Sequence, residues 1–202
     1  FDAYLAKRMA EVFDAYEPDF DEISQKLFRL PSALSRFERT GVVSYNDVHA
    51  IGAVGMTARM SGLCRDIRLT HPHDLYQKIG HQPIIKHHGD VYSRAQVRKE
   101  EIKQSIAYCR QMALNIPDTG DEKRLSTQLP PSSFALSLVE GWRGEICHCA
   151  ITSQRGDLIL YKIKDPSFHN WMALALAVRN HEISDFPVCN KSFNLSYCGH
   201  DL

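Results

Sequence analysis

The chain has 202 residues, enough for one sizeable hydrophobic core, and we expect a single domain over residues 1–202. Its hydrophobic content of 44% and charged content of 24% are typical of a globular protein, and a net charge of +0 gives no electrostatic reason to expect a nucleic-acid partner. No apolar run approaches the roughly 20 residues that cross a bilayer, so work at a membrane would go through partners. The sequence starts at Phe1, and we expect it to be the C-terminal fragment of a longer chain.

Two helices are predicted near the start of the sequence. Apolar residues recur at helical spacing over residues 1–17, and Pro18 is expected to end that helix. A second, short helix is predicted over residues 20–29, stopped by Pro31. Residues 41–92 are interrupted by many glycines and by prolines, which favours turns and short pieces over long elements.

The clearest helix is predicted to begin at residues 93–96, whose Ser-Arg-Ala-Gln sequence has the spacing of a capping box, and to continue to about Leu114. We expect it to be the longest or second-longest element. Residues 116–133 are polar and contain three prolines, so they are predicted to be the most mobile loop. Ion pairs around the capped helix are expected among Asp90, Arg94, Arg98 and Glu101.

An antiparallel hairpin is the best strand signal. Residues 145–152 and 157–164 are rich in β-branched and aromatic residues, and the turn at 153–156 joins them. The Asp-Pro pair at 165–166 then supplies an N-cap and a first-turn proline for a helix predicted to reach about Arg179. The fold class is therefore predicted to be α+β, mostly α, with a small antiparallel sheet.

Six cysteines occur, and none of them forms a C-x-x-C pair. We expect reduced thiols that are mostly buried. A structural zinc site is the alternative, although its spacing matches no standard ligand pair. That site would be built from Cys147, Cys149, Cys198 and His200.

Four stretches carry a family resemblance. Motif residues within 41–76 and 89–105 are similar to the quinone-site large subunit of respiratory complex I. The E-G-W-R-G-E-x-x-H sequence at 140–148 is similar to a segment of nickel–iron hydrogenase large subunits, and K-I-K-D-P-S-F-H at 162–169 resembles complex I again. In this order they resemble the C-terminal half of a large subunit of the complex I / membrane-bound nickel–iron hydrogenase family. The resemblance implies a hydrogenase-large-subunit-like helical domain.

The resemblance also bears on metal. In the hydrogenase branch two cysteines near the C-terminus bind nickel, and soft thiolates are what that metal pair needs. Aligned without a gap from the C-terminus, these positions fall on Ser196 and Gly199, with Cys198 one residue out of register. In another alignment Cys198 takes the second position and Leu195 the first. Both lack a thiolate pair, so we expect no nickel–iron centre and no cofactor in this chain.

Arg143 is the first candidate for a functional role. It matches the arginine that, in the hydrogenase family, donates to the diatomic ligands on iron. Without metal, its guanidinium could hydrogen-bond a quinone carbonyl or a carboxylate. The alternative is a buried structural pair with Glu140, Glu145 or Asp165. In either case we expect Arg143 within hydrogen-bonding reach of an acidic side chain or a backbone carbonyl.

Two histidines in the matched motifs, His148 and His169, are candidates for proton relay near neutral pH, or else satisfied core histidines. Together with Arg143 they are the predicted catalytic residues. We further expect the C-terminal residues to pass close to the 140–148 segment, because the resemblance brings both to one cavity. The predicted cofactor-binding residues there are Arg143, Ser196, Cys198 and His200.

The resemblance implies an oxidoreductase subunit of a membrane-associated electron-transfer complex, quinone-linked and related to NADH dehydrogenase and hydrogenase. Expected partners are a small subunit carrying the iron–sulfur clusters, membrane-embedded subunits, and the missing N-terminal half of the chain, which would complete the site. The expected location is cytoplasmic, peripheral on the inner face of the cell membrane. Hydrogen activation needs the thiolates, so quinone reduction is the preferred chemistry, and the isolated fragment is expected to be inactive. The alternative is a catalytically silent subunit that docks the iron–sulfur subunit onto membrane partners.

Overall fold

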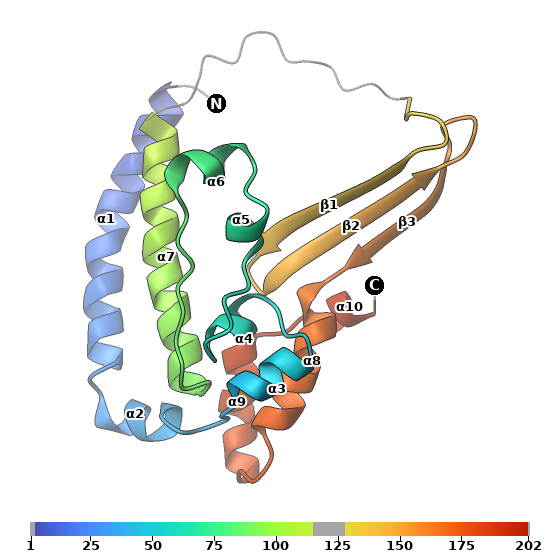
Figure 1. The fold of residues 1–202 in the computed structure, drawn as a ribbon. Coiled ribbons are helices and arrows are strands. Elements are labelled where there is room, and N and C mark those ends of the chain that lie inside the picture. Colours follow the sequence, from blue (N-terminus) through green and yellow to red (C-terminus); the bar gives the residue numbers. More distant parts are fainter. Residues whose placement is uncertain (1–2, 115–127, 202) are drawn as a thin grey trace.

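The computed structural model describes residues 3–114 and 128–201. A helical body carries a three-stranded antiparallel sheet that projects from one side (Figure 1), which confirms the predicted fold class. The helices are α1 (Ala3–Leu27), α2 (Pro31–Phe37), α3 (Tyr45–Ala50), α4 (Gly55–Arg59), α5 (Ile67–Thr70), α6 (Asp74–Ile79), α7 (Val91–Leu114), α8 (Pro166–Ala177), the short 3-10 helix η1 (Ile183–Asp185), α9 (Phe186–Phe193) and α10 (Tyr197–His200). The strands are β1 (Phe134–Gly141), β2 (Gly144–Thr152) and β3 (Leu158–Lys164).

The long helices α1 and α7 lie side by side and run in opposite directions (Figure 1). Salt bridges join them, Arg110 to Asp14 at 2.7 Å and Lys103 to Asp21 at 2.8 Å. These two pairs lie on either side of Pro18, where the sequence predicted the helix to end. That prediction is wrong, because α1 continues through Pro18 to Leu27 and includes most of the predicted second helix.

The segment between the long helices consists of short helices and turns, as predicted for residues 41–92. Ser44 caps α3 in a capping box with Asp47, and Gly80 ends α6 in the left-handed conformation. This segment packs on α7, α8 and α9 and contributes about half of the buried core. The core cluster comprises Val43, Val48, Ala53, Ala58, Met60, Val91, Ala173, Leu174, Ala177, Cys189, Phe193 and Leu195.

Helix α7 spans 24 described residues against 25 for α1, so it is one of the two longest elements of the described chain, as predicted. It runs to Leu114, where the first described range ends. Its start differs from the prediction. The helix begins at Val91, and Asp90 is the residue whose Oδ1 accepts from the Ser93 amide at 2.8 Å. The predicted capping box at 93–96 is therefore wrong, because the carboxylate three residues earlier already satisfies that amide. Most of the predicted mobile loop of residues 116–133 lies outside the described residues, namely its residues 116–127.

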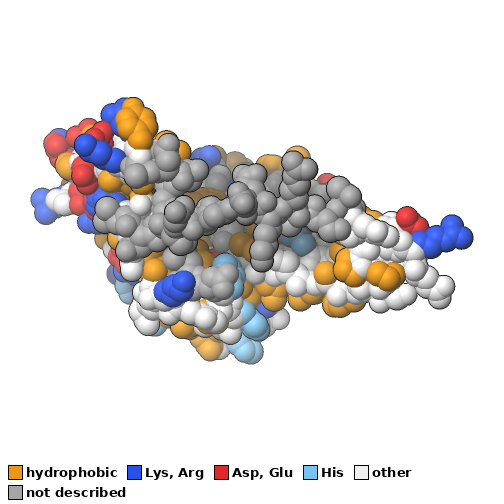
Figure 2. Space-filling view, turned by 90° about the horizontal axis from the view of Figure 1, so that it is seen from above, with side chains coloured by type: hydrophobic (Ala, Val, Ile, Leu, Met, Phe, Trp, Pro, Cys, Tyr) orange, Lys and Arg blue, Asp and Glu red, His pale blue; other side chains and the backbone are white. Residues whose placement is uncertain are grey.

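The predicted hairpin is present as β2 and β3, and the Ser153 amide donates to the Asp157 carbonyl at 2.8 Å in the turn between them. The sequence did not predict β1, which pairs with the other edge of β2. Most side chains of β1 and β3 are exposed, and Figure 2 shows hydrophobic side chains along the projecting sheet. The sheet therefore offers apolar surface on an extension of the body.

After the sheet the chain returns to the helical body. Asp165 caps α8 by accepting from the Ser167 amide at 2.8 Å, and Pro166 is in the first turn, both as predicted. The helix ends at Ala177, near the predicted end. Helices α9 and α10, which the sequence did not reveal, bring the tail back across the body. Within the described residues, no helix is both long and apolar enough to cross a membrane.

Candidate functional site

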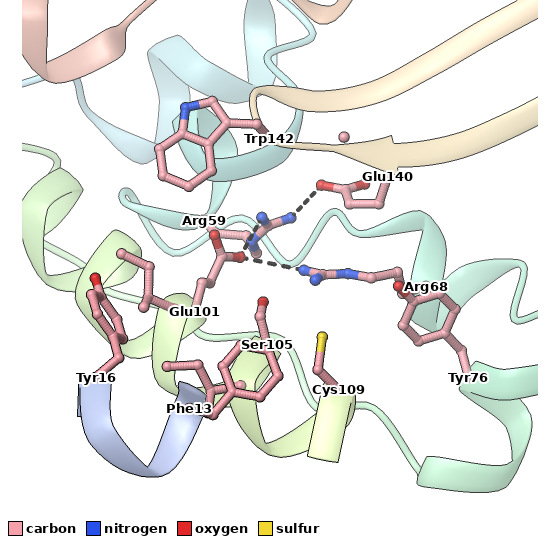
Figure 3. Close-up of a pocket in the computed structure, with 13 residues that line it drawn as sticks. Phe13, Tyr16, Arg59, Arg68, Tyr76, Glu101, Ser105, Cys109, Glu140 and Trp142 are labelled. Carbon is pink, nitrogen blue, oxygen red and sulfur yellow. Dashed lines mark hydrogen bonds and ion pairs between the residues drawn. The ribbon is translucent and has the colours of Figure 1, made fainter. Parts of the chain in front are cut away.

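A cavity of about 440 Å³ opens between α1, α7, the α4–α6 segment and the turn that joins β1 to β2 (Figure 3). Aromatic and aliphatic side chains form much of its wall, and charged side chains from α4, α5, α7 and β1 form the rest. A volume of this size suits a small organic molecule. The lining residues with apolar or aromatic groups include Phe13, Tyr16, Tyr76, Ile102, Ile106 and Trp142.

Arg59 is the centre of the charged wall and is almost completely buried, with 1% of its surface exposed. Its Nη1 donates to Glu140 Oε1 at 2.8 Å and lies 3.1 Å from Asp66 Oδ2. Its Nη2 donates to Glu101 Oε1 at 2.7 Å. Helix α4 is thus connected through one guanidinium to α5, α7 and β1.

Arg68 completes the charged wall. Its guanidinium forks onto Asp66, with Nε to Oδ1 at 2.9 Å and Nη2 to Oδ2 at 2.7 Å, and its Nη2 also donates to Glu101 at 3.3 Å. The Glu101 carboxylate is therefore bonded to both guanidinium groups (Figure 3). We call Arg59, Asp66, Arg68, Glu101 and Glu140 the charged cluster.

Burial acts differently on the members of the charged cluster. It raises the pKa of Asp66, but hydrogen bonds from Arg68 and His81 and the charge of Arg59 outweigh it, so that the pKa is well below its usual range. For Glu140 burial is dominant and raises the pKa, with Arg59 only partly opposing it. Burial lowers the pKa of Arg59, but nearby carboxylates outweigh this effect and raise it above its ordinary value. Asp66 and Arg59 are thus held ionised, whereas Glu140 is biased toward its protonated form.

Arg143 lies in the β1–β2 turn directly after Trp142, which lines the cavity, and its Nε donates to the Asn194 carbonyl between α9 and α10. This confirms that Arg143 reaches a backbone carbonyl and that the tail passes close to the 140–148 segment. The carbonyl of Arg143 accepts from Asn170 on α8 at 3.1 Å. The alternative ion pair with Glu140, Glu145 or Asp165 is not formed in the described part of the chain: Arg59 binds Glu140, Arg65 pairs with Glu145, and Asp165 caps α8.

The other predicted catalytic residues are not gathered around Arg143. His148 is half-buried on β2, and its Nδ1 hydrogen-bonds the hydroxyl of Tyr161 on β3. His169 is on α8, where its ring lies edge-on to Phe168 at 5.9 Å. Burial, assisted by the charge of Lys164, lowers the pKa of His169. Their roles in proton relay remain predictions.

The tail residues that match the nickel-ligand positions have structural partners. Ser196 caps α10, and its Oγ accepts from the Gly199 amide at 3.0 Å. A Cβ atom on Gly199 would lie 2.5–2.9 Å from the carboxyl group of Asp165, so a cysteine there would require this carboxyl group, which caps α8, to shift. These residues do not fit a nickel–iron centre.

Cys198 and His200, the remaining predicted cofactor-binding residues, are both exposed. The His200 ring stacks on Phe168 at 5.6 Å. Across residues 3–114 and 128–201, no three His, Cys, Asp or Glu side chains are placed to hold a metal ion together, which leaves the alternative zinc site without support. All six cysteines are free, and only Cys189 is buried, so the expectation of mostly buried thiols is wrong.

The ion pairs predicted around α7 are also wrong in their partners. Arg94 donates to the carbonyls of Gly41 and Gly89, both at 3.0 Å, and Arg98 donates to the carbonyl of Phe193 at 3.0 Å. Glu101 belongs instead to the charged cluster. Four of its members (Arg59, Asp66, Arg68 and Glu101) lie within the stretches 41–76 and 89–105 that carry the resemblance, and Glu140 was considered only as a partner of Arg143. Because 81 residues separate Arg59 from Glu140, no local pattern showed that they meet.

Comparison with known proteins gives the chain a context. Residues 1–133 match the family described as "Respiratory-chain NADH dehydrogenase, 49 Kd subunit". The chain is 32% identical over 182 residues to the carbon monoxide-induced hydrogenase of Rhodospirillum rubrum, a match that covers 90% of this chain and 50% of that protein. It is 27% identical over 200 residues to an NADH-quinone oxidoreductase subunit of Roseiflexus sp. (strain RS-1), with 93% and 53% covered.

The fold has a close structural counterpart. A chain in the structure of the membrane-bound sulfane sulfur reductase, described as an archaeal respiratory membrane complex, superposes with a TM-score of 0.88 at 20% sequence identity. The superposition covers 98% of this chain and 55% of that one. The chain thus spans about half the length of these relatives.

Proposed function

This chain belongs to the family of the 49 kDa subunit of respiratory-chain NADH dehydrogenase and the large subunits of membrane-bound hydrogenases, and from that premise we propose its function. It is the C-terminal part of an oxidoreductase large subunit that works in a membrane-associated electron-transfer complex. Its partners are a small iron–sulfur subunit and membrane-embedded subunits, and the N-terminal half of its own chain completes the site. The complex is quinone-linked, lacks a nickel–iron centre, and lies peripherally on the inner face of the membrane.

The tail carries this proposal. Soft thiolates are required to hold nickel and iron together, and a serine hydroxyl is too weakly acidic to replace one. Ser196 is engaged as the cap of α10, and the space beside Gly199 contains the Asp165 carboxyl group. The tail therefore favours reduction of an organic acceptor over the activation of hydrogen at this position.

Arg143 is the residue proposed to bind that acceptor. Its Nε is fixed by the Asn194 carbonyl, and within the described part of the chain its Nη groups have no hydrogen-bond partner. A guanidinium held by one nitrogen can offer the others to a planar acceptor such as a quinone carbonyl. The donor would stabilise the negative charge that develops on this oxygen during reduction.

The exposed sheet supports the proposed partners. Phe134, Leu136, Ile159 and Tyr161 are each at least half exposed on β1 and β3. Large exposed apolar groups on a projecting element are typical of a surface that another protein covers. The relatives named as subunits of quinone oxidoreductases and the membrane complex of the structural counterpart are consistent with such an assembly.

Quinone reductase activity of the intact complex tests the role of Arg143. Replacing Arg143 by glutamine is expected to lower kcat about 100-fold, since removal of a donor to a developing oxyanion typically costs that much. Arg143→Lys keeps the charge and is expected to recover part of the loss. Arg155→Gln, at the β2–β3 turn, is the control and should leave the rate unchanged. If both arginine-to-glutamine variants assemble and keep full activity, the complex works without Arg143, and a catalytically silent, docking role becomes the better description.

A further inference from the structure

The charged cluster does not balance in charge. It contains two arginines and three carboxylates, so its formal charge is one negative unit. Its side chains are strongly shielded from solvent, with 2% exposure for Arg59, 0% for Asp66, 3% for Glu140, 13% for Arg68 and 14% for Glu101. A buried charge without compensation is costly, and such groups commonly bind a proton instead.

Geometry distinguishes the three carboxylates. Asp66 receives a two-pronged contact from Arg68 and a further one from His81, at 3.2 Å. Glu101 accepts from both guanidinium groups. Each of these two carboxylates is therefore bonded to Arg68 and lies close to Arg59.

The negative charge of Glu140 is compensated less than that of Asp66 or Glu101. Glu140 shares a single nitrogen, Arg59 Nη1, with Asp66 and with the carbonyl of Arg65. Among the described residues, its other oxygen accepts only from the backbone amide of Ile67, at 3.2 Å. Burial and the nearby Asp66 both act to raise the pKa of Glu140, in agreement with this geometry.

From this arrangement we propose that the charged cluster binds one exchangeable proton and that Glu140 is the group that holds it. With that proton the cluster is neutral: two arginines face two carboxylates. Glu140 and Glu101 both line the cavity, so the proton is stored where an acceptor in the cavity can use it. Its storage is a property of the resting protein, and only its use in quinone reduction depends on the proposed function.

Other titratable groups surround the charged cluster. Glu145 lies opposite Glu140 in the β1–β2 ladder and is paired with Arg65 at 3.2 Å, outside the cluster. Behind Asp66, the buried His81 also hydrogen-bonds Tyr108 at 3.0 Å and packs edge-on against Tyr76. His81 is thus the alternative binding site for the proton, and the test must distinguish a proton on His81 from one on Glu140.

Infrared difference spectra between pH values, recorded on the intact resting protein, test the proposal. A protonated buried carboxyl gives a C=O stretch that ionised carboxylates lack. We expect this band in the wild type, its loss in Glu140→Gln, and its retention in Glu145→Gln, the matched control from the same pair of strands. In Glu101→Gln the cluster is neutral without a proton, so the band should disappear at a lower pH than in the wild type.

Two results would overturn the proposal. A band that survives in Glu140→Gln would show that another carboxyl group holds the proton, and no band in the wild type would show that no carboxyl group holds it, as for a proton on His81. An unchanged titration in Glu101→Gln would show that the excess charge does not hold the proton. Because no electron donor or quinone is present in this measurement, its outcome is independent of whether the complex reduces quinone.

Discussion

Replacing Arg94 by alanine is expected to lower the free energy of unfolding by about 4 kcal/mol. The Arg94 side chain is completely buried on α7 and donates to the carbonyls of Gly41 and Gly89 and to the hydroxyl of Ser192. Its guanidinium also lies 4.2 Å above the ring of Phe193 on α9. Alanine would leave the Gly41 carbonyl and the Ser192 hydroxyl without this donor, would take one of two donors from the Gly89 carbonyl, which also accepts from the Val43 amide, and would create a cavity between α7 and α9.

No carboxylate pairs with Arg94 among the residues described, and burial lowers its pKa to about 9. The backbone carbonyls therefore act as the counterpart of its charge. Chemical denaturation of the intact protein measures the effect. Arg8→Ala is the control, because Arg8 is exposed and its one ion pair in the described part of the chain is with Glu11 on the same helix. This variant should change stability by no more than about 0.5 kcal/mol. A loss below about 1 kcal/mol for Arg94→Ala would contradict the proposed structural role.

Substituting Gly55 with alanine should destabilise the fold by about 4 kcal/mol, through a steric clash that has no flexible side chain to relieve it. Gly55 begins α4 with φ +61°, and its backbone lies directly against the Arg143 turn. A Cβ atom would come within 2.2 Å of Gly144 Cα and 2.6 Å of the Arg143 carbonyl oxygen. The turn would have to move, and with it the proposed acceptor site.

Gly52 provides a matched control for Gly55. It has nearly the same conformation, φ +66°, but a Cβ atom there would meet no atom within 4 Å. Gly52→Ala is therefore expected to cost only the left-handed backbone penalty of about 1 kcal/mol. The difference between the two variants, measured by thermal or chemical denaturation, isolates the contact with the turn. Equal losses would mean that the β1–β2 turn is not held against α4.

Local signals in the sequence predicted the elements that depend on local interactions. The hairpin of β2 and β3 and the Asp165 cap both follow from residues close together in the chain. Helix α1 shows where such reasoning fails. Proline inside a helix costs about 3 kcal/mol, yet α1 continues through Pro18 because α7 holds it on both sides of that residue.

The missed elements depend on distant partners. Strand β1 exists through its pairing with β2, and most of its side chains are exposed, so it lacks the pattern of a half-buried strand. Helix α9 is held at its C-terminal end by Arg94 and Arg98 of α7, about 95 residues earlier. Spacing within the sequence contains no information about such contacts.

In the candidate site, too, the sequence predicted some features, whereas those that depend on contacts between distant residues were missed. The resemblance correctly placed Arg143 beside the tail, because a family pattern preserves long-range proximity that composition does not show. The charged cluster could not be assembled in this way. Its members come from four separate elements. Only the folded chain shows that Arg59 forms ion pairs with three carboxylates and that Glu140 has the weakest compensation of its negative charge.

Elemental analysis of the native membrane complex, purified through a tag on the intact protein, tests the central claim most directly. The account predicts iron and acid-labile sulfide in the proportions of iron–sulfur clusters, contributed by the partner subunit, together with no stoichiometric nickel. Nickel at one atom per complex would show that the tail binds metal in spite of Ser196 and Gly199 and would contradict the claim. So would a purified complex that contains neither iron nor sulfide.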